Sequence, residues 1–180
     1  MLINNFIEVF DFDTSWLKPY KEDMVNQYFE NLDLDRGNNT PYKNDEIEKS
    51  LSFRFEKVVK DNFIVTRNIK EIKPWIYVQN NKHTLNQWHN HINSATLNAT
   101  LYLDPPKDGG ELCFIYPDNL QENIEDTYIK IKPEENKLYV FPSWMIHKPL
   151  PQKDEKNRVC INLEWYCKQR PISKTSFSVW

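Results

Sequence analysis

The first third of the chain has the hydrophobic spacing of one strand followed by two amphipathic helices. Residues 2–12 alternate between apolar and polar side chains, and this pattern predicts a strand. Large apolar residues then recur at a period near 3.6 over residues 14–32, behind a hydroxyl residue that can cap a helix. Thr40-Pro41 is a typical helix opening and predicts a second helix over 40–62. The apolar face of this second helix consists of Ile47, Leu51, Phe55, Val58 and Val59.

From Phe63 onward the pattern changes to short runs of β-branched and aromatic residues that are separated by turn residues. These runs predict strands near residues 63–67, 70–79, 87–91, 96–104, 110–116, 126–132, 136–142 and 157–167. Many short strands at this spacing are typical of an antiparallel sandwich or barrel. We therefore expect one mainly β domain of the jelly-roll type. Residues 1–62 would form a strand and two buttressing helices, 63–170 the β core and 171–180 a tail.

The composition narrows the class of protein without identifying it. A chain of 180 residues with 39% hydrophobic and 14% aromatic residues is long and apolar enough to fold as one domain. The net charge of −3 excludes a strongly basic nucleic-acid surface and favours no membrane partner. Three cysteines without a CxxC pair, and a start too polar for a signal peptide, predict a cytoplasmic protein with buried thiols. No feature indicates the oligomeric state.

Three of the four histidines occupy positions that suggest a metal site. His89 and His91 flank one residue on a predicted strand, so both imidazoles can point to the same side of a sheet. His147 follows the strand that ends at Pro142, and in a jelly roll such distant segments can be neighbours. The alternative is a pair of surface histidines and a core histidine. His83 lies in a polar loop, where we expect a solvated side chain.

Arg158 starts an otherwise apolar strand. A buried arginine needs an anionic partner, because an unpaired buried charge is costly. The planar guanidinium group suits a carboxylate. That carboxylate belongs either to a bound ligand or to an acidic residue such as Glu111 or Glu164.

In order and spacing, these pieces resemble the Fe(II)/2-oxoglutarate-dependent oxygenase superfamily, particularly its short phage and marine-microbial members and its prolyl-hydroxylase-like branch. The resemblance covers residues 75–165, about half of the chain. The segments that carry it are Trp88-His89-Asn90-His91, Ala99–Leu103, Gly109–Leu112, Leu138–Pro142 leading to His147, and Arg158 before Asn162.

The resemblance implies a double-stranded β-helix with one Fe(II) held by His89, His91 and His147. It also implies that Arg158 binds the distal carboxylate of 2-oxoglutarate, assisted by Tyr77, Asn86 or Tyr102. The implied activity couples oxidative decarboxylation of 2-oxoglutarate by O2 to hydroxylation of a substrate. That substrate would be a small molecule, an amino acid or a peptide, and the metal ligands would be the whole catalytic set.

One departure from the family pattern leaves alternatives open. His91 stands where these oxygenases usually have a carboxylate ligand. Either His91 binds the metal, or Asp104 or Glu111 completes the site, or the site holds another metal or is weakly active. A three-histidine cupin-type dioxygenase that works without 2-oxoglutarate is a second interpretation, and a non-catalytic jelly-roll binding module is a third. The aromatic residues Trp75, Trp88, Phe114 and Trp144 could line a dry pocket or belong to the core.

Overall fold

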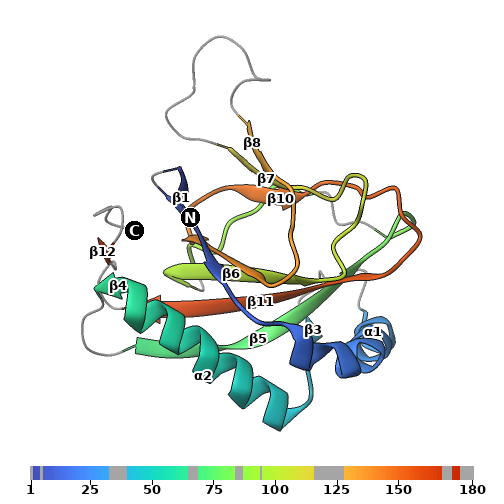
Figure 1. The fold of residues 1–180 in the computed structure, drawn as a ribbon, viewed down its shortest axis with the longest axis horizontal. Helices are drawn as coiled ribbons and strands as arrows, with labels where there is room; N and C mark the ends of the chain where they lie inside the picture. Colours follow the sequence, from blue (N-terminus) through green and yellow to red (C-terminus); the bar gives the residue numbers. More distant parts are fainter. Residues whose placement is uncertain are drawn as a thin grey trace.

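The larger of two facing β-sheets carries the longer helix on its outer side, and the shorter helix lies at one end of this sheet (Figure 1). The computed structural model describes residues 2–4, 6–32, 40–64, 69–83, 87–93, 95–115, 128–167 and 172–174. The larger sheet has seven strands in the order β1 (Leu2–Asn4), β2 (Ile7–Asp11), β9 (Lys137–Pro142), β6 (Leu97–Leu103), β11 (Arg158–Cys167), β5 (Ile69–Gln79) and β3 (Thr40–Pro41).

The smaller sheet lies opposite and has the order β10 (His147–Pro149), β7 (Leu112–Ile115) and β8 (Tyr128–Ile131). A short pair, β12 (Ile172–Ser173) with β4 (Phe63–Ile64), lies beside the larger sheet. All pairings between neighbouring strands are antiparallel. This arrangement confirms the predicted mainly β fold with N-terminal helices.

Two helical segments cover the larger sheet. A 3-10 helix (Ser15–Tyr20) leads into α1 (Lys21–Glu30), and α2 covers residues Asp45–Asn62. The predicted apolar face of α2 is buried at Ile47, Leu51, Phe55 and Val59, whereas Val58 is only partly buried. The ring of Phe55 lies 6.2 Å from that of Trp165 on β11, so α2 packs on the outer face of the sheet. No helix in the described part of the chain is long and apolar enough to cross a bilayer.

Two predictions about the helices were wrong in detail. Thr40 and Pro41 do not open α2 but form β3 at the sheet edge, where a proline without an N–H group is tolerated. The helix starts after Asn44, whose Oδ1 accepts a hydrogen bond of 3.2 Å from the Ile47 N–H. The expected single helix over 14–32 is divided into a 3-10 and an α segment, and the Thr14 hydroxyl donates to Asn136 Oδ1 instead of capping it.

The predicted strand over 87–91 was also wrong. In the described part of this segment the only ladder contact is an isolated bridge between His89 and His147. The chain here is anchored to the neighbouring segment by single backbone hydrogen bonds. Backbone hydrogen bonds, and not the alternation of a strand, therefore place His89 and His91.

The register of the larger sheet separates an apolar outer face from a more polar inner face. Residues opposite one another in antiparallel strands point to the same side. The outer face is apolar and buried at Ile76, Val78, Leu97, Ala99, Leu101, Leu103, Val159, Ile161, Leu163 and Trp165. The inner face, toward the smaller sheet, carries Trp75, Tyr77, Gln79, Asn98, Thr100, Tyr102, Arg158, Cys160, Asn162 and Glu164. Polar and aromatic groups thus line the space between the sheets.

Candidate active site

Backbone hydrogen bonds bring three histidines together at one end of the space between the sheets. The N–H groups of His89 and His147 each donate to the carbonyl of the other, at 3.0 and 2.9 Å. The N–H of His91 donates to the carbonyl of Ser143 at 2.9 Å, in the turn between β9 and β10. One ligand atom from each of the three imidazoles lies within 4.8 Å of the others. Such a cluster can hold one metal ion.

Each of these imidazoles has its Nδ1 atom engaged. His89 Nδ1 lies 3.0 Å from the carbonyl of Gln87, and His147 Nδ1 lies 2.9 Å from that of Met145. His91 Nδ1 lies 2.9 Å from Oε1 of Glu164. A hydrogen bond at Nδ1 holds the ring in place and leaves Nε2 with its lone pair for a metal. This arrangement leaves the three Nε2 atoms available to a metal ion.

Burial keeps two of these histidines neutral. It lowers the pKa of His147 well below its usual value, with a further contribution from nearby His89. Burial also lowers the pKa of His89. A neutral imidazole is the form that binds a metal, so the site is ready for an ion at neutral pH.

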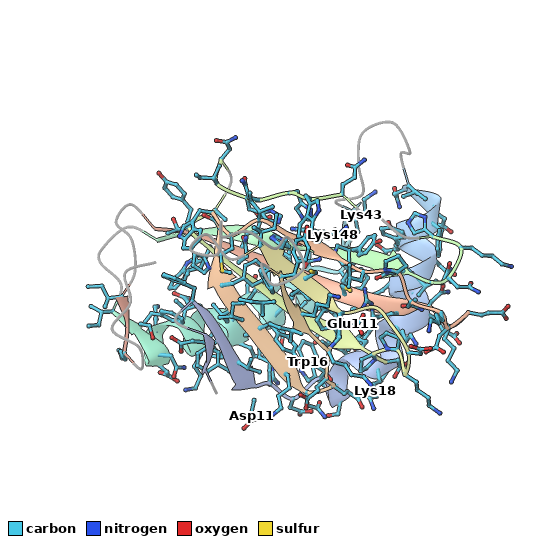
Figure 2. The ribbon with its side chains drawn as sticks, turned by 90° about the horizontal axis from the view of Figure 1, so that it is seen from above. Asp11, Trp16, Lys18, Lys43, Glu111 and Lys148 are labelled. Carbon is cyan, nitrogen blue, oxygen red and sulfur yellow. The ribbon has the colours of Figure 1, made fainter. Side chains whose placement is uncertain are left out.

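The two carboxylates considered as alternative ligands are not part of the cluster. Among the described residues, the group consists of the three histidines alone. Asp104 forms a salt bridge with Lys21 at the surface. Figure 2 places Asp11 and Lys18 along one edge of the molecule and Lys148, which follows His147, away from that edge.

Arg158 is buried deep on the same inner face, with only 1% of its surface exposed. Its Nη1 donates to the carbonyl of Gly110, and its Cζ lies 5.1 Å from the centre of the Tyr102 ring. Its Nε and Nη2 atoms are buried and have no hydrogen-bond partner within the described residues. The acidic partners proposed for it are not used, since Glu164 contacts His91 instead. Two N–H-bearing atoms of the guanidinium group are thus left for a ligand.

Two of the three glycines of the chain form the Gly109-Gly110 pair, which lies beside Arg158. Both have positive φ, +73° and +72°, which glycine adopts without strain. A Cβ at Gly110 would lie only 2.8 Å from Nη1 of Arg158 and 2.6 Å from Cγ of Pro106. The glycine allows the backbone to approach the guanidinium group closely.

The residues predicted to assist Arg158 have different positions. Tyr102 and Tyr77 lie in register with Cys160 on the two strands that flank β11, and all three are buried. Burial raises the pKa of Tyr102 above its usual range, so its hydroxyl stays protonated. Asn86 lies outside the described residues. Both described tyrosines are on the inner face, and Tyr102 contacts the guanidinium group directly.

The other histidine and two of the cysteines lie outside the histidine cluster. His83 is not a solvated loop residue as expected, because its Nε2 lies 2.9 Å from the Tyr28 hydroxyl and its ring packs between aromatic rings. Burial lowers the pKa of His83. The expected buried thiols are confirmed at Cys113 and Cys160.

The four aromatic residues that could line a pocket or belong to the core form two pairs in the structure. Phe114 and Trp75 lie next to the histidines, with ring centres 5.7 Å from His147 and 6.2 Å from His91 respectively. Trp88 stacks on Tyr128 and Trp144 packs edge-on against Phe6. Only the first pair therefore borders the candidate site.

Two inner-face residues of the site were missed by sequence reasoning. Glu164 was considered only as a partner for Arg158, yet it binds His91. Asn98, opposite Glu164 in the register, is buried with neither amide atom hydrogen-bonded within the described residues. The even spacing of Arg158 and Glu164 on one predicted strand was the available signal, because it places both side chains on one face.

Comparison with solved structures establishes the fold class. The viral collagen prolyl hydroxylase vCPH from Paramecium Bursaria Chlorella virus-1 is 12% identical with a TM-score of 0.60, covering 91% of this chain and 90% of its own. A Trichoplax adhaerens prolyl hydroxylase, in complex with a hypoxia inducible factor peptide fragment, is 17% identical with a TM-score of 0.63 (92% and 85% covered). HygX from Streptomyces hygroscopicus with nickel and 2-oxoglutarate bound is 10% identical with a TM-score of 0.63 (90% and 83% covered). The fold is the double-stranded β-helix of these oxygenases.

The family follows from the sequence itself. Residues 73–164, half of the chain, match the family described as "Putative 2OG-Fe(II) oxygenase". The chain belongs to this family of 2-oxoglutarate- and Fe(II)-dependent oxygenases and is an enzyme of that class. A search of curated proteins finds no match.

The cofactors of this family suit the groups that the site presents. Three imidazoles with engaged Nδ1 atoms offer a nitrogen ligand set for Fe(II). The buried Nε and Nη2 atoms of Arg158 offer donors for a dicarboxylate such as 2-oxoglutarate. Both sets of groups face the same space between the sheets.

Proposed function

We propose that this enzyme is a hydroxylase that holds Fe(II) through His89, His91 and His147 and binds the distal carboxylate of 2-oxoglutarate through Arg158. The observation that carries the proposal is the pairing of a three-imidazole cluster with a buried arginine, two of whose nitrogen atoms have no hydrogen-bond partner among the described residues. A buried guanidinium group is costly unless an anion joins it. A carboxylate that accepts from both nitrogens would complete its hydrogen bonds.

The bound cofactors would supply the oxidising chemistry, in which O2 converts 2-oxoglutarate to succinate and CO2 and a substrate C–H bond is hydroxylated. The chain's own residues would position the bound cofactors. Tyr102 would hold the arginine under its ring face, and its protonated hydroxyl would remain a neutral neighbour to the co-substrate. Phe114 and Phe141, whose rings lie 5.7 and 4.8 Å from His147, would keep water from that side of the metal.

The substrate class is drawn from the relatives and from the net charge of the chain. One relative of the same fold is a complex with a peptide, and another was crystallised with the small molecule hygromycin B. The chain's net charge of −3 disfavours a polynucleotide. We propose a peptide, amino-acid or small-molecule substrate.

The test is an anaerobic titration of metal-free protein with Fe(II) and then 2-oxoglutarate, followed by the weak visible absorption of the iron chelate. The band should appear in the wild type and in the control His83→Ala, which removes a histidine outside the cluster. It should be lost in His91→Ala and require far more 2-oxoglutarate in Arg158→Met. A wild type that binds iron without a band, and consumes O2 with substrate alone, would replace this proposal by the cupin-type dioxygenase. A wild type that binds no iron would refute both.

A further inference from the structure

The proposed metal site contains no anionic ligand, whereas oxygenases of this type usually bind Fe(II) through two histidines and a carboxylate. Three imidazole ligands carry no negative charge and leave the double charge of the ion uncompensated. The position that usually supplies the carboxylate is His91. The question is therefore whether another part of the chain supplies the missing negative charge.

Glu164 is the carboxylate that contacts this cluster. It lies on the inner face of β11, its surface is 5% exposed, and its Oε1 is 2.9 Å from Nδ1 of His91. The same oxygen accepts a hydrogen bond of 3.2 Å from Nε1 of Trp75. A shift in the β5–β11 register next to Trp75 accompanies this contact. Glu164 is therefore held at the Nδ1 side of the His91 ring by contacts with both His91 and Trp75.

The three ligand histidines differ in what holds them. His89 and His147 have neutral backbone carbonyls at Nδ1, and only His91 has a carboxylate. The one acidic contact is thus made to the one histidine that replaces the usual acidic ligand. A carboxylate at Nδ1 fixes the tautomer of the ring and increases the basicity of its other nitrogen.

We infer that Glu164 is a positioning residue that acts on the metal through His91. The negative charge that a carboxylate ligand usually supplies at the metal is supplied here on the far side of the His91 ring. This inference rests on the proposed function, because it requires His91 to be a ligand. Glu164 itself touches neither the metal nor the substrate. Its effect should appear in the affinity and electronic spectrum of the bound ion and not only in turnover.

The experiment measures Fe(II) affinity anaerobically and the visible spectrum of the Co(II)-substituted protein. Glu164→Gln keeps the size of the side chain and an oxygen that can accept from His91, but it removes the charge. Loss of such an outer carboxylate typically weakens metal binding about 10- to 100-fold, and we expect that range together with a shifted Co(II) spectrum. Glu164→Asp, which restores the charge on a shorter side chain, should recover part of the affinity.

Glu8→Gln is the matched control. Glu8 is a buried acid of the same sheet that accepts a hydrogen bond from Ser173, and the register places it on the outer face, opposite the inner face that carries Glu164. Its substitution removes the same charge from a similarly buried place and should leave Fe(II) affinity unchanged. In a His91→Ala background, Glu164→Gln should have no further effect on the affinity, because the connecting ring is gone.

The outcomes separate the two proposals. Wild-type protein without iron binding refutes the proposed function. Wild-type protein that binds iron, with Glu164→Gln showing the same affinity and the same Co(II) spectrum, refutes only the role of Glu164. If Glu164→Gln does not fold, the comparison moves to Glu164→Asp, and wild-type affinity and spectrum there overturn the inference, because the shorter side chain cannot keep the 2.9 Å contact.

Discussion

Replacing Arg158 by methionine should strongly weaken 2-oxoglutarate binding with little effect on the stability of the ligand-free protein. The substitution fills the space of the side chain and removes a charge that is 99% buried. It deprives the Gly110 carbonyl of its donor, a loss of about 1–3 kcal/mol. It also removes two buried nitrogens without partners, and replacing buried charge by a well-packed apolar group is often worth about 1–4 kcal/mol.

These two contributions have opposite signs and similar size. The free energy of unfolding should therefore stay within about 2 kcal/mol of the wild-type value. For a chain of this length that corresponds to a change in Tm of no more than about 4–8 °C. If Arg158 instead belonged to a structural ion pair, its removal would cost about 3–5 kcal/mol. Thermal and urea unfolding of metal-free protein distinguish these cases.

The effect on the co-substrate should be much larger. Loss of one partner from a buried charge pair costs about 2–5 kcal/mol, which is about a 30- to 4,000-fold increase in Kd. Anaerobic calorimetry of 2-oxoglutarate binding to the Fe(II) protein measures this Kd. Arg158→Lys serves as the comparison, because it keeps the charge, loses the planar group and should have an intermediate affinity. An unchanged Kd in Arg158→Met, with or without a strong loss of stability, would refute the role of Arg158 in binding 2-oxoglutarate.

Two further predictions concern the glycine turn and the pH. Gly110→Ala should weaken 2-oxoglutarate binding more than Gly109→Ala, because both place alanine at positive φ but only the former pushes a Cβ against Arg158. Equal Kd values in calorimetry would contradict this. The metal-free protein should lose stability as the pH falls below about 6.5, since unfolding lets His89 and His147 take up protons that burial denies them. The slope should approach about 1.4 kcal/mol per pH unit for His147 in urea titrations, with a smaller contribution from His89, and a flat profile between pH 7.5 and 5.5 would count against it.

Local periodicity was sufficient for much of the fold, whereas the clustered histidines were identified from their order and spacing and from the family resemblance. The apolar face of α2 was predictable because helical spacing depends only on nearby residues. Most strands of the two sheets were also predicted, since each run is short, β-branched or aromatic and bounded by turn residues. The strand over 87–91 failed because its two histidines are held by isolated backbone bonds to His147 and Ser143, which no local pattern encodes.

The sequence by itself determined which residue types were available for the site: three histidines in a suggestive order, one arginine on an apolar strand and one glycine pair. The contacts that these residues make with one another are set by the tertiary structure. Glu164 contacts His91 and not Arg158, and two nitrogen atoms of Arg158 are left without a hydrogen-bond partner in the described part of the chain. These choices depend on the register between strands that are far apart in the chain and on the approach of the two sheets. Such contacts arise from packing of the whole domain, so a linear pattern of residues cannot specify them.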